Sequence, residues 1–157
     1  MSVNKLLFNK IKEQVMAEPK SLSMRFFCRF LPKSVTNEHN CGTVGCIGGW
    51  AMLLMGLKKP LKAYKDWENR EDSSPEVPSI NEDQVAAALL GIPMTEARLL
   101  FYFYAHFGAF VNSDHPYQAL ADKLTHHREG SVNYAKVVCE AIDLCIFRGE
   151  QGLFAND

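Results

Sequence analysis

Two cysteines and a histidine stand close together in a glycine-rich segment, residues 39–51, which reads His-Asn-Cys-Gly-Thr-Val-Gly-Cys-Ile-Gly-Gly-Trp-Ala. A cysteine near the start of a helix is a better nucleophile at neutral pH, because the helix dipole favours the thiolate over the thiol. Cys41 and Cys46 are therefore candidate nucleophiles. A cysteine-dependent hydrolase centred on either of them is one hypothesis for the function.

The partners that a nucleophilic cysteine needs are not evident. The stretch around Cys41 and Cys46 superficially resembles the nucleophile helix of papain-like and bacteriocin-processing cysteine peptidases. Those folds also require a histidine presented by a β-strand and an Asp or Asn that orients it. Here His106 lies in a predicted helix, His115 directly precedes a proline, and no predicted strand follows. The hydrolase is therefore the alternative hypothesis, and the sequence assigns no catalytic residue.

The same segment offers weaker signals for a metal or an anion. Structural zinc sites commonly use cysteine pairs separated by two residues, whereas one residue separates His39 from Cys41 and four separate Cys41 from Cys46. Backbone N–H groups of residues 42–45 at a helix start are a feature of anion sites. The strand and the lysine of a phosphate-binding loop are missing, however. We predict no metal and no cofactor.

Close packing explains the glycines without any chemistry. A glycine inside a helix costs about 1 kcal/mol relative to alanine, so four of them in this segment need a compensating role. Gly45 and Gly49 are four residues apart on a helix predicted from an N-cap at Thr43 to about Leu57, where a neighbouring helix can approach closely. We interpret the segment as a structural motif formed by Cys41, Gly42, Thr43, Cys46, Gly49, Trp50 and Ala51.

A second unusual stretch is rich in aromatic residues and runs from Phe101 to Phe110. It holds more rings than one face of a helix can bury, so some rings should cover neighbouring helices or a partner. Core packing is the simpler interpretation. The alternative is a binding surface for a protein partner or a second copy of the chain, formed by Phe101, Tyr102, Tyr104 and His106.

Hydrophobic spacing and capping signals predict helices through most of the chain and no strand. The predicted helices cover residues 3–17, 21–30, 43–57, 95–107, 114–126 and 131–148. A further helix is predicted to start at a capping box, Ser79 to Glu82, and to end at Gly91. Gly149 is predicted to end the helix over residues 131–148. Residues 58–80 are rich in proline and charge, which predicts a surface loop or insert. The predicted fold is all-α: a single domain over residues 1–157, built as an irregular bundle of about six to eight helices.

Composition narrows the class of protein further. Of the 157 residues, 47% are hydrophobic and 22% are charged, which is typical of a globular domain. The longest apolar stretch, residues 99–111, is too short for a membrane span, and no secretory signal is recognisable, so we expect a cytoplasmic protein that binds no membrane. The odd number of cysteines, five, favours reduced thiols over a disulfide framework. The basic residues between positions 5 and 33 are a weak argument for nucleic acid, because the net charge is only −1.

The order Cys-Gly-Thr-x-x-Cys-Ile-x-Gly-x-Ala in residues 41–51 resembles the hallmark of an uncharacterised family of small bacterial and phage proteins. Other positions agree with that family in order along the chain: Ile11, Pro19, Met24, residues 89–92, Ala97, residues 100–101, Ala141, Ile142 and Gly149. The insert at 58–80 departs from the family pattern. The resemblance implies a helical fold and an intracellular setting, but it supplies no catalytic residue.

These features together favour a non-enzymatic interaction or regulatory module as the function. Its predicted partner is another protein or a second copy of the chain, bound through the aromatic stretch or the basic N-terminal helix. A cysteine-dependent hydrolase is the alternative, and a nucleic-acid accessory protein ranks below both.

Overall fold

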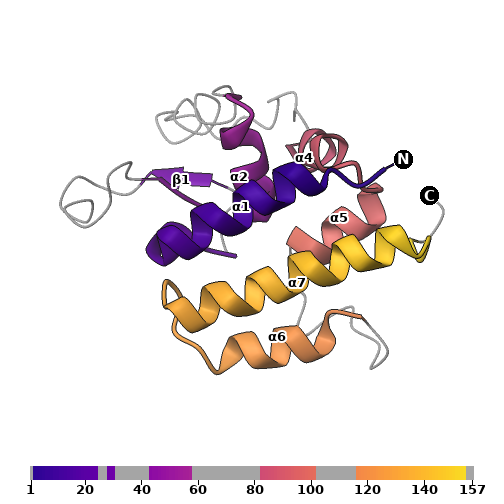
Figure 1. Cartoon of the computed structure of the whole chain (residues 1–157). Coiled ribbons are helices and arrows are strands. Elements are labelled where there is room, and N and C mark those ends of the chain that lie inside the picture. Colours follow the sequence, from indigo (N-terminus) through magenta and orange to yellow (C-terminus); the bar gives the residue numbers. More distant parts are fainter. Residues whose placement is uncertain (1, 25–27, 31–42, 58–81, 102–115, 155–157) are drawn as a thin grey trace, which may run out of the picture.

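The computed structural model describes residues 2–24, 28–30, 43–57, 82–101 and 116–154. Six α-helices dominate this part of the chain (Figure 1): α1 Lys5–Ala17, α2 Ile47–Leu54, α4 Glu82–Leu90, α5 Met94–Phe101, α6 Gln118–Thr125 and α7 Val132–Glu150. A short 3-10 helix, η1 Pro19–Ser21, follows α1. Two strands of three residues, β1 Cys28–Phe30 and β2 Thr43–Gly45, pair antiparallel, with Arg29 opposite Val44. The predicted all-α fold is confirmed, but the prediction of no strand is wrong for these two short segments.

The long helices α1 and α7 lie side by side and run in opposite directions (Figure 1). Helix α2 packs against α1 and α4, helix α5 packs against α2, α4 and α7, and helix α6 covers another side of α7. The apolar stripes of these helices meet in one core, whose largest fully buried side chains include Phe8, Ile11, Phe101, Tyr117 and Ile142. Burying such stripes is the main source of stability for short helices, which are marginal alone in water.

The predicted start of the last helix at residue 131 and the predicted end at Gly91 are confirmed, whereas α2 ends at Leu54 and not at about Leu57. Ser131 is the N-cap of α7, and its side chain accepts a hydrogen bond from the N–H of Tyr134. Gly91 and Gly56 follow α4 and α2 with φ angles of +67° and +73°, a conformation that glycine adopts without a Cβ penalty.

The predicted helix over residues 21–30 is wrong. Ser21 ends η1, residues 22–24 are buried and not helical, and Cys28–Phe30 is a strand. The indole N–H of Trp50 donates to the carbonyl of Ser21 at 3.1 Å, and the hydroxyl of Tyr134 accepts from the N–H of Met24 at 3.4 Å. Side chains from α2 and α7 therefore satisfy backbone groups that a helix would otherwise pair internally.

The N-cap predicted at Thr43 and the helix stop predicted at Gly149 are also wrong. Residues 43–45 pair with β1, so α2 begins only at Ile47, with Cys46 in the N-cap position. Gly45 consequently does not share a helix with Gly49, although Gly49 is buried in α2. Helix α7 continues through Gly149 to Glu150, and Gly152, with φ of +66°, follows its end.

Some predictions fall outside the residues that the structure describes. They concern the loop at 58–80, the capping residue Ser79, the helix start at Asp114, and residues 102–110 of the aromatic stretch. Within the described ranges, no single helix is long and apolar enough to cross a membrane. Helices α4 and α5 would pass that test as a pair by length and composition, but they are bent by 106° where they join.

Candidate functional site

Cys46 lies at the N-terminal end of α2, where the hydrolase hypothesis would place a nucleophile. The residue is only 1% exposed and belongs to the hydrophobic core. Burial raises the pKa of the Cys46 thiol to about 11, although hydrogen bonds from the backbone N–H groups of Gly49 and Gly48 act in the opposite direction. Desolvation therefore outweighs the helix terminus, and Cys46 is a neutral thiol at pH 7.

The neighbouring residues of the predicted structural motif are also in the core. Gly49 and Ala51 are buried in α2, and Trp50, 6% exposed, anchors Ser21 through the hydrogen bond described above. Thr43 lies in β2. Cys41 and Gly42 fall outside the described residues.

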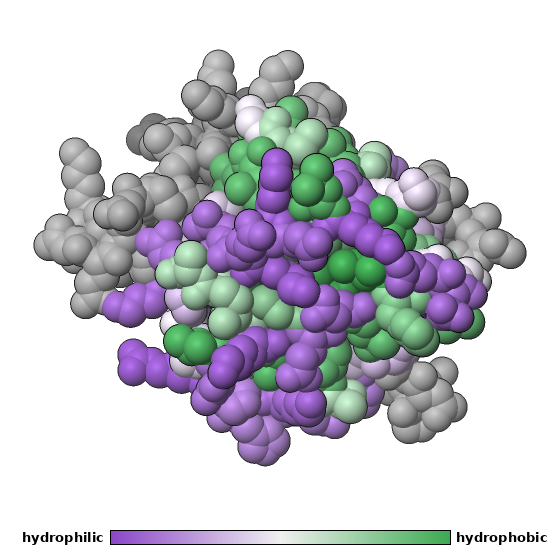
Figure 2. Space-filling view, viewed as in Figure 1, coloured by the Kyte–Doolittle hydropathy of each residue, from purple (hydrophilic) through white to green (hydrophobic). Residues whose placement is uncertain are grey.

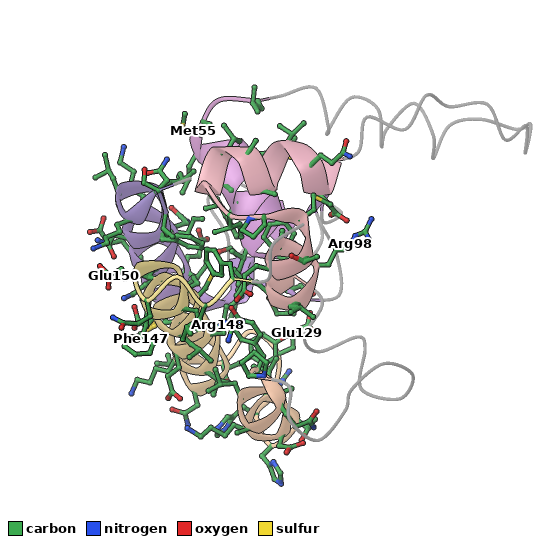
Figure 3. All side chains as sticks on the ribbon, turned by 90° about the vertical axis from the view of Figure 1, so that its right-hand side faces the viewer. Met55, Arg98, Glu129, Phe147, Arg148 and Glu150 are labelled. Atoms are coloured by element: carbon green, nitrogen blue, oxygen red, sulfur yellow. The ribbon has the colours of Figure 1, made fainter. Side chains whose placement is uncertain are left out.

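The most concentrated polar chemistry that the structure describes lies elsewhere, at a carboxylate buried between α5, α6 and α7. Glu96 of α5 is 2% exposed. Its two oxygens accept from Arg148 of α7, from Nε at 2.9 Å and from Nη2 at 3.1 Å, in a bidentate pair. The hydroxyl of Tyr117, at the start of α6, donates to the same carboxylate at 2.5 Å. Figure 3 shows Arg148 reaching from α7 toward the interior.

The groups around Glu96 are held in fixed protonation states. Burial, followed by the proximity of Cys145 and Glu96, raises the pKa of the Tyr117 hydroxyl, so this group stays protonated and donates. Hydrogen bonding to Glu96 raises the pKa of Arg148. Burial also raises the pKa of the nearby Cys145 thiol to about 12, although a hydrogen bond with Tyr117 acts in the opposite direction. None of these three groups titrates near neutral pH.

This arrangement is suited to holding helices together rather than to catalysis. Arg148 also donates from Nη2 to the carbonyl of Leu153 at 3.2 Å, so one guanidinium joins α5, α7 and the turn after α7. A buried carboxylate with a bidentate arginine and a tyrosine hydroxyl has its charge compensated and its lone pairs largely satisfied.

Sequence reasoning missed this cluster. The available signal was the position of Glu96 on the buried stripe of α5, beside Ala97 and one turn before Leu100. An acid in the first turn of a helix is also favoured by the helix dipole at an exposed site. Nothing in the sequence showed that Arg148, 52 positions further along, would lie opposite it.

The aromatic binding surface predicted from Phe101 onward is wrong for Phe101 itself. Its side chain is fully buried, with 0% exposure, because it continues the apolar stripe of α5 into the core. Tyr102, Tyr104 and His106 lie outside the described residues.

Metal-ligating residues do not gather in the described part of the chain, where no three His, Cys, Asp or Glu side chains are placed to hold an ion. Cys46 and Cys145 are buried and Cys139 is half-buried, and none of these three cysteines is in a disulfide. Comparison of the chain with models of protein families, with curated proteins and with solved structures finds no match.

Proposed function

We propose that this protein is a non-enzymatic interaction or regulatory module. One observation supports this most strongly: the described candidate nucleophile, Cys46, and the polar cluster around Glu96 are both buried in the interior. The thiols of Cys46 and Cys145 are buried with raised pKa values, and the carboxylate of Glu96 is paired with Arg148. A catalytic group must instead lie within reach of a bound substrate.

The surface offers apolar side chains for contact with a partner. The large hydrophobic residues that remain exposed are Leu6, Met16, Leu54, Met55, Leu57, Val132, Phe147 and Leu153, of which Leu6 is the most exposed at 69%. Aromatic and methionine side chains are enriched in protein interfaces. A cytoplasmic setting and membership of the bacterial and phage family that residues 41–51 resemble are part of the same proposal.

The cysteine-dependent hydrolase is the second candidate because of one specific feature. The backbone groups of Gly48 and Gly49 at the start of α2 act to lower the pKa of the Cys46 thiol, which is how a helix start stabilises a thiolate. Complete burial works against this candidate.

A hydrolysis assay with variants of both candidate cysteines separates the two proposals. We expect the purified protein to cleave generic peptide and ester substrates no faster than its Cys41→Ser and Cys46→Ser variants, because neither thiol would act as a nucleophile. We also expect no stoichiometric zinc in elemental analysis. Hydrolysis that one of the two substitutions abolishes would establish the enzyme instead, and about one zinc per chain would establish a metal site.

A further inference from the structure

Two short segments that flank the helices, residues 2–4 and 151–154, lie at the same end of the molecule. Figure 1 shows the start of α1 beside the end of α7, close to the corner between α4 and α5. Figure 3 looks onto this end of the molecule, with Arg148 and Glu150 at the end of α7. On the face shown in Figure 2, hydrophobic side chains remain visible between hydrophilic ones toward this end.

Residues 2–4 are attached to the end of α4 by their backbone. The N–H of Asn4 donates to the carbonyl of Leu90 at 2.8 Å. The carbonyl oxygen of Ser2 lies so close to Gly91 that no Cβ would fit between them. This segment therefore closes over the point where α4 ends.

Residues 151–154 fold back onto the end of α7. The N–H of Leu153 donates to the carbonyl of Arg148 at 2.8 Å, and that of Gly152 donates to the carbonyl of Gly149 at 3.2 Å. Gly152 has a φ angle of +66°. This pattern is a Schellman motif, a common way in which a helix satisfies its last carbonyl groups.

Val3 and Phe154 bring the two segments together over Gly149. A Cβ added to Gly149 would overlap Cγ2 of Val3 and the ring of Phe154, of which the Cζ atom would be only 2.8 Å away. The two side chains therefore lie side by side against a position of α7 that carries no side chain. Both are half-buried and pack against the hydrophobic core, and Lys5 pairs with Glu150 in the same region.

Arg148 connects these two segments to the buried Glu96 cluster. Its Nη2 group donates to the carbonyl of Leu153 at 3.2 Å and to Glu96 at 3.1 Å. The side chain of Arg148 is 18% exposed, against 2% for that of Glu96, so the guanidinium lies on the solvent side of the carboxylate. Movement of Leu153 therefore acts on the group that covers Glu96.

We infer that residues 2–4 and 151–154 form one clasp, a conformational device that opens as a unit and, when closed, holds Arg148 against Glu96. Surface segments with few buried contacts are the parts of a protein that open locally while the core stays folded. Because Val3 and Phe154 share one site on α7, loss of either side chain also removes contacts from the other segment. A partner that displaced either segment would thereby loosen the Glu96 cluster. The inference goes beyond the proposed function, because it concerns an enzyme and an interaction module alike.

Native-state hydrogen exchange followed by NMR tests whether the two segments open together. We expect Val3→Ala and Phe154→Ala each to speed the exchange of two amides, those of Asn4 and Leu153, by at least about tenfold. Amides in the middle of α7, such as that of Val138, should be unchanged, because the core stays folded.

The side chain of Arg148 gives a second readout in the same spectra. Its Nε–H donates to Glu96 at 2.9 Å, and we expect this proton to exchange faster in both variants, because an open clasp no longer holds the guanidinium in place. The matched control is Leu153→Ala, which removes a 53% exposed side chain from the same turn. This control should leave all of these exchange rates within about twofold of those of the unchanged protein.

The variant Gly149→Ala should open the clasp without removing any side chain. Alanine favours a helix more than glycine does, so α7 itself should be retained, while the added methyl group displaces Val3 and Phe154. We expect faster exchange of the Asn4 and Leu153 amides, again by at least about tenfold.

Three results would overturn the inference. If each alanine substitution affects only its own segment, the two segments open independently. If Gly149→Ala changes neither amide, Val3 and Phe154 do not close over α7. If the amide of Val138 accelerates as much as those of the clasp, the variants weaken the whole fold. An unchanged exchange rate of the Arg148 Nε–H would overturn the coupling to Glu96.

Discussion

Arg148→Met is expected to lower the free energy of unfolding by about 3–5 kcal/mol, which is the usual cost of removing one partner from a buried ion pair. The carboxylate of Glu96 is 2% exposed and takes two hydrogen bonds from Arg148. Without the guanidinium, only the hydroxyl of Tyr117 is described as donating to that charge. Chemical denaturation followed by circular dichroism measures the loss.

The matched control for Arg148→Met is Lys123→Met. Lys123 also pairs with a carboxylate across two helices, that of Glu140 at 2.9 Å, but both side chains are half-exposed or more. Exposed pairs contribute about 0–1 kcal/mol, so this variant should be nearly neutral. The double variant Glu96→Gln with Arg148→Met should recover part of the loss, because it removes the buried charge itself. Equal, small effects of Arg148→Met and Lys123→Met would show that the Glu96 cluster does not hold the helices.

Gly91→Ala is expected to cost nearly as much as Arg148→Met, about 2–4 kcal/mol, because it combines backbone strain with overpacking. Gly91 has φ of +67°, and a Cβ there would lie 2.2 Å from the carbonyl oxygen of Ser2. The atom that a Cβ at Gly91 would meet belongs to the backbone of residue 2, and two hydrogen bonds of Asn4 hold this segment in place. The N–H of Asn4 donates to the carbonyl of Leu90 at 2.8 Å, and its side-chain amide donates to the carbonyl of Leu89 at 2.9 Å.

The control variant Gly56→Ala separates the cost of backbone strain from the cost of overpacking. Gly56 has a similar φ of +73°, but a Cβ there meets nothing within 4 Å. This control should lose only the strain of a left-handed alanine, about 1 kcal/mol. If thermal melts show the same shift for both variants, the close approach of residues 2–4 to the end of α4 does not contribute to stability.

Helices that carry a continuous apolar stripe could be predicted from the sequence. The helices predicted over residues 3–17 and 131–148 are close to α1 and α7, because each segment carries a continuous apolar stripe. The helix at 21–30 could not be excluded in this way. Its aromatic spacing fits a helix, but the backbone of Ser21 and Met24 is bonded by Trp50 and Tyr134, which are distant in the sequence.

The candidate site was predicted less well than the fold, because it also depends on contacts between residues that are distant in the sequence. The glycine-rich segment indicated a structural role for Cys46, Gly49 and Trp50, and all three are in fact buried. Nothing in the segment indicated that residues 43–45 would pair with β1, so that the helix begins only at Ile47. Glu96 and Arg148 each look like ordinary helix-end charges until the packing of α5 on α7 brings them together.

Site-resolved alkylation of the native protein most directly tests the claim that its thiols are structural. Iodoacetamide at pH 7, followed by peptide mapping, should label Cys46 at least about 100-fold more slowly than the unfolded chain, because a pKa of about 11 instead of 9.0 lowers the thiolate fraction by that factor and burial adds to it. Cys145 should be slower still, and Cys41 should react no faster than an ordinary free thiol. Labelling of Cys41 or Cys46 in the native protein that is faster than labelling of the unfolded chain would contradict this claim and favour the cysteine-dependent hydrolase.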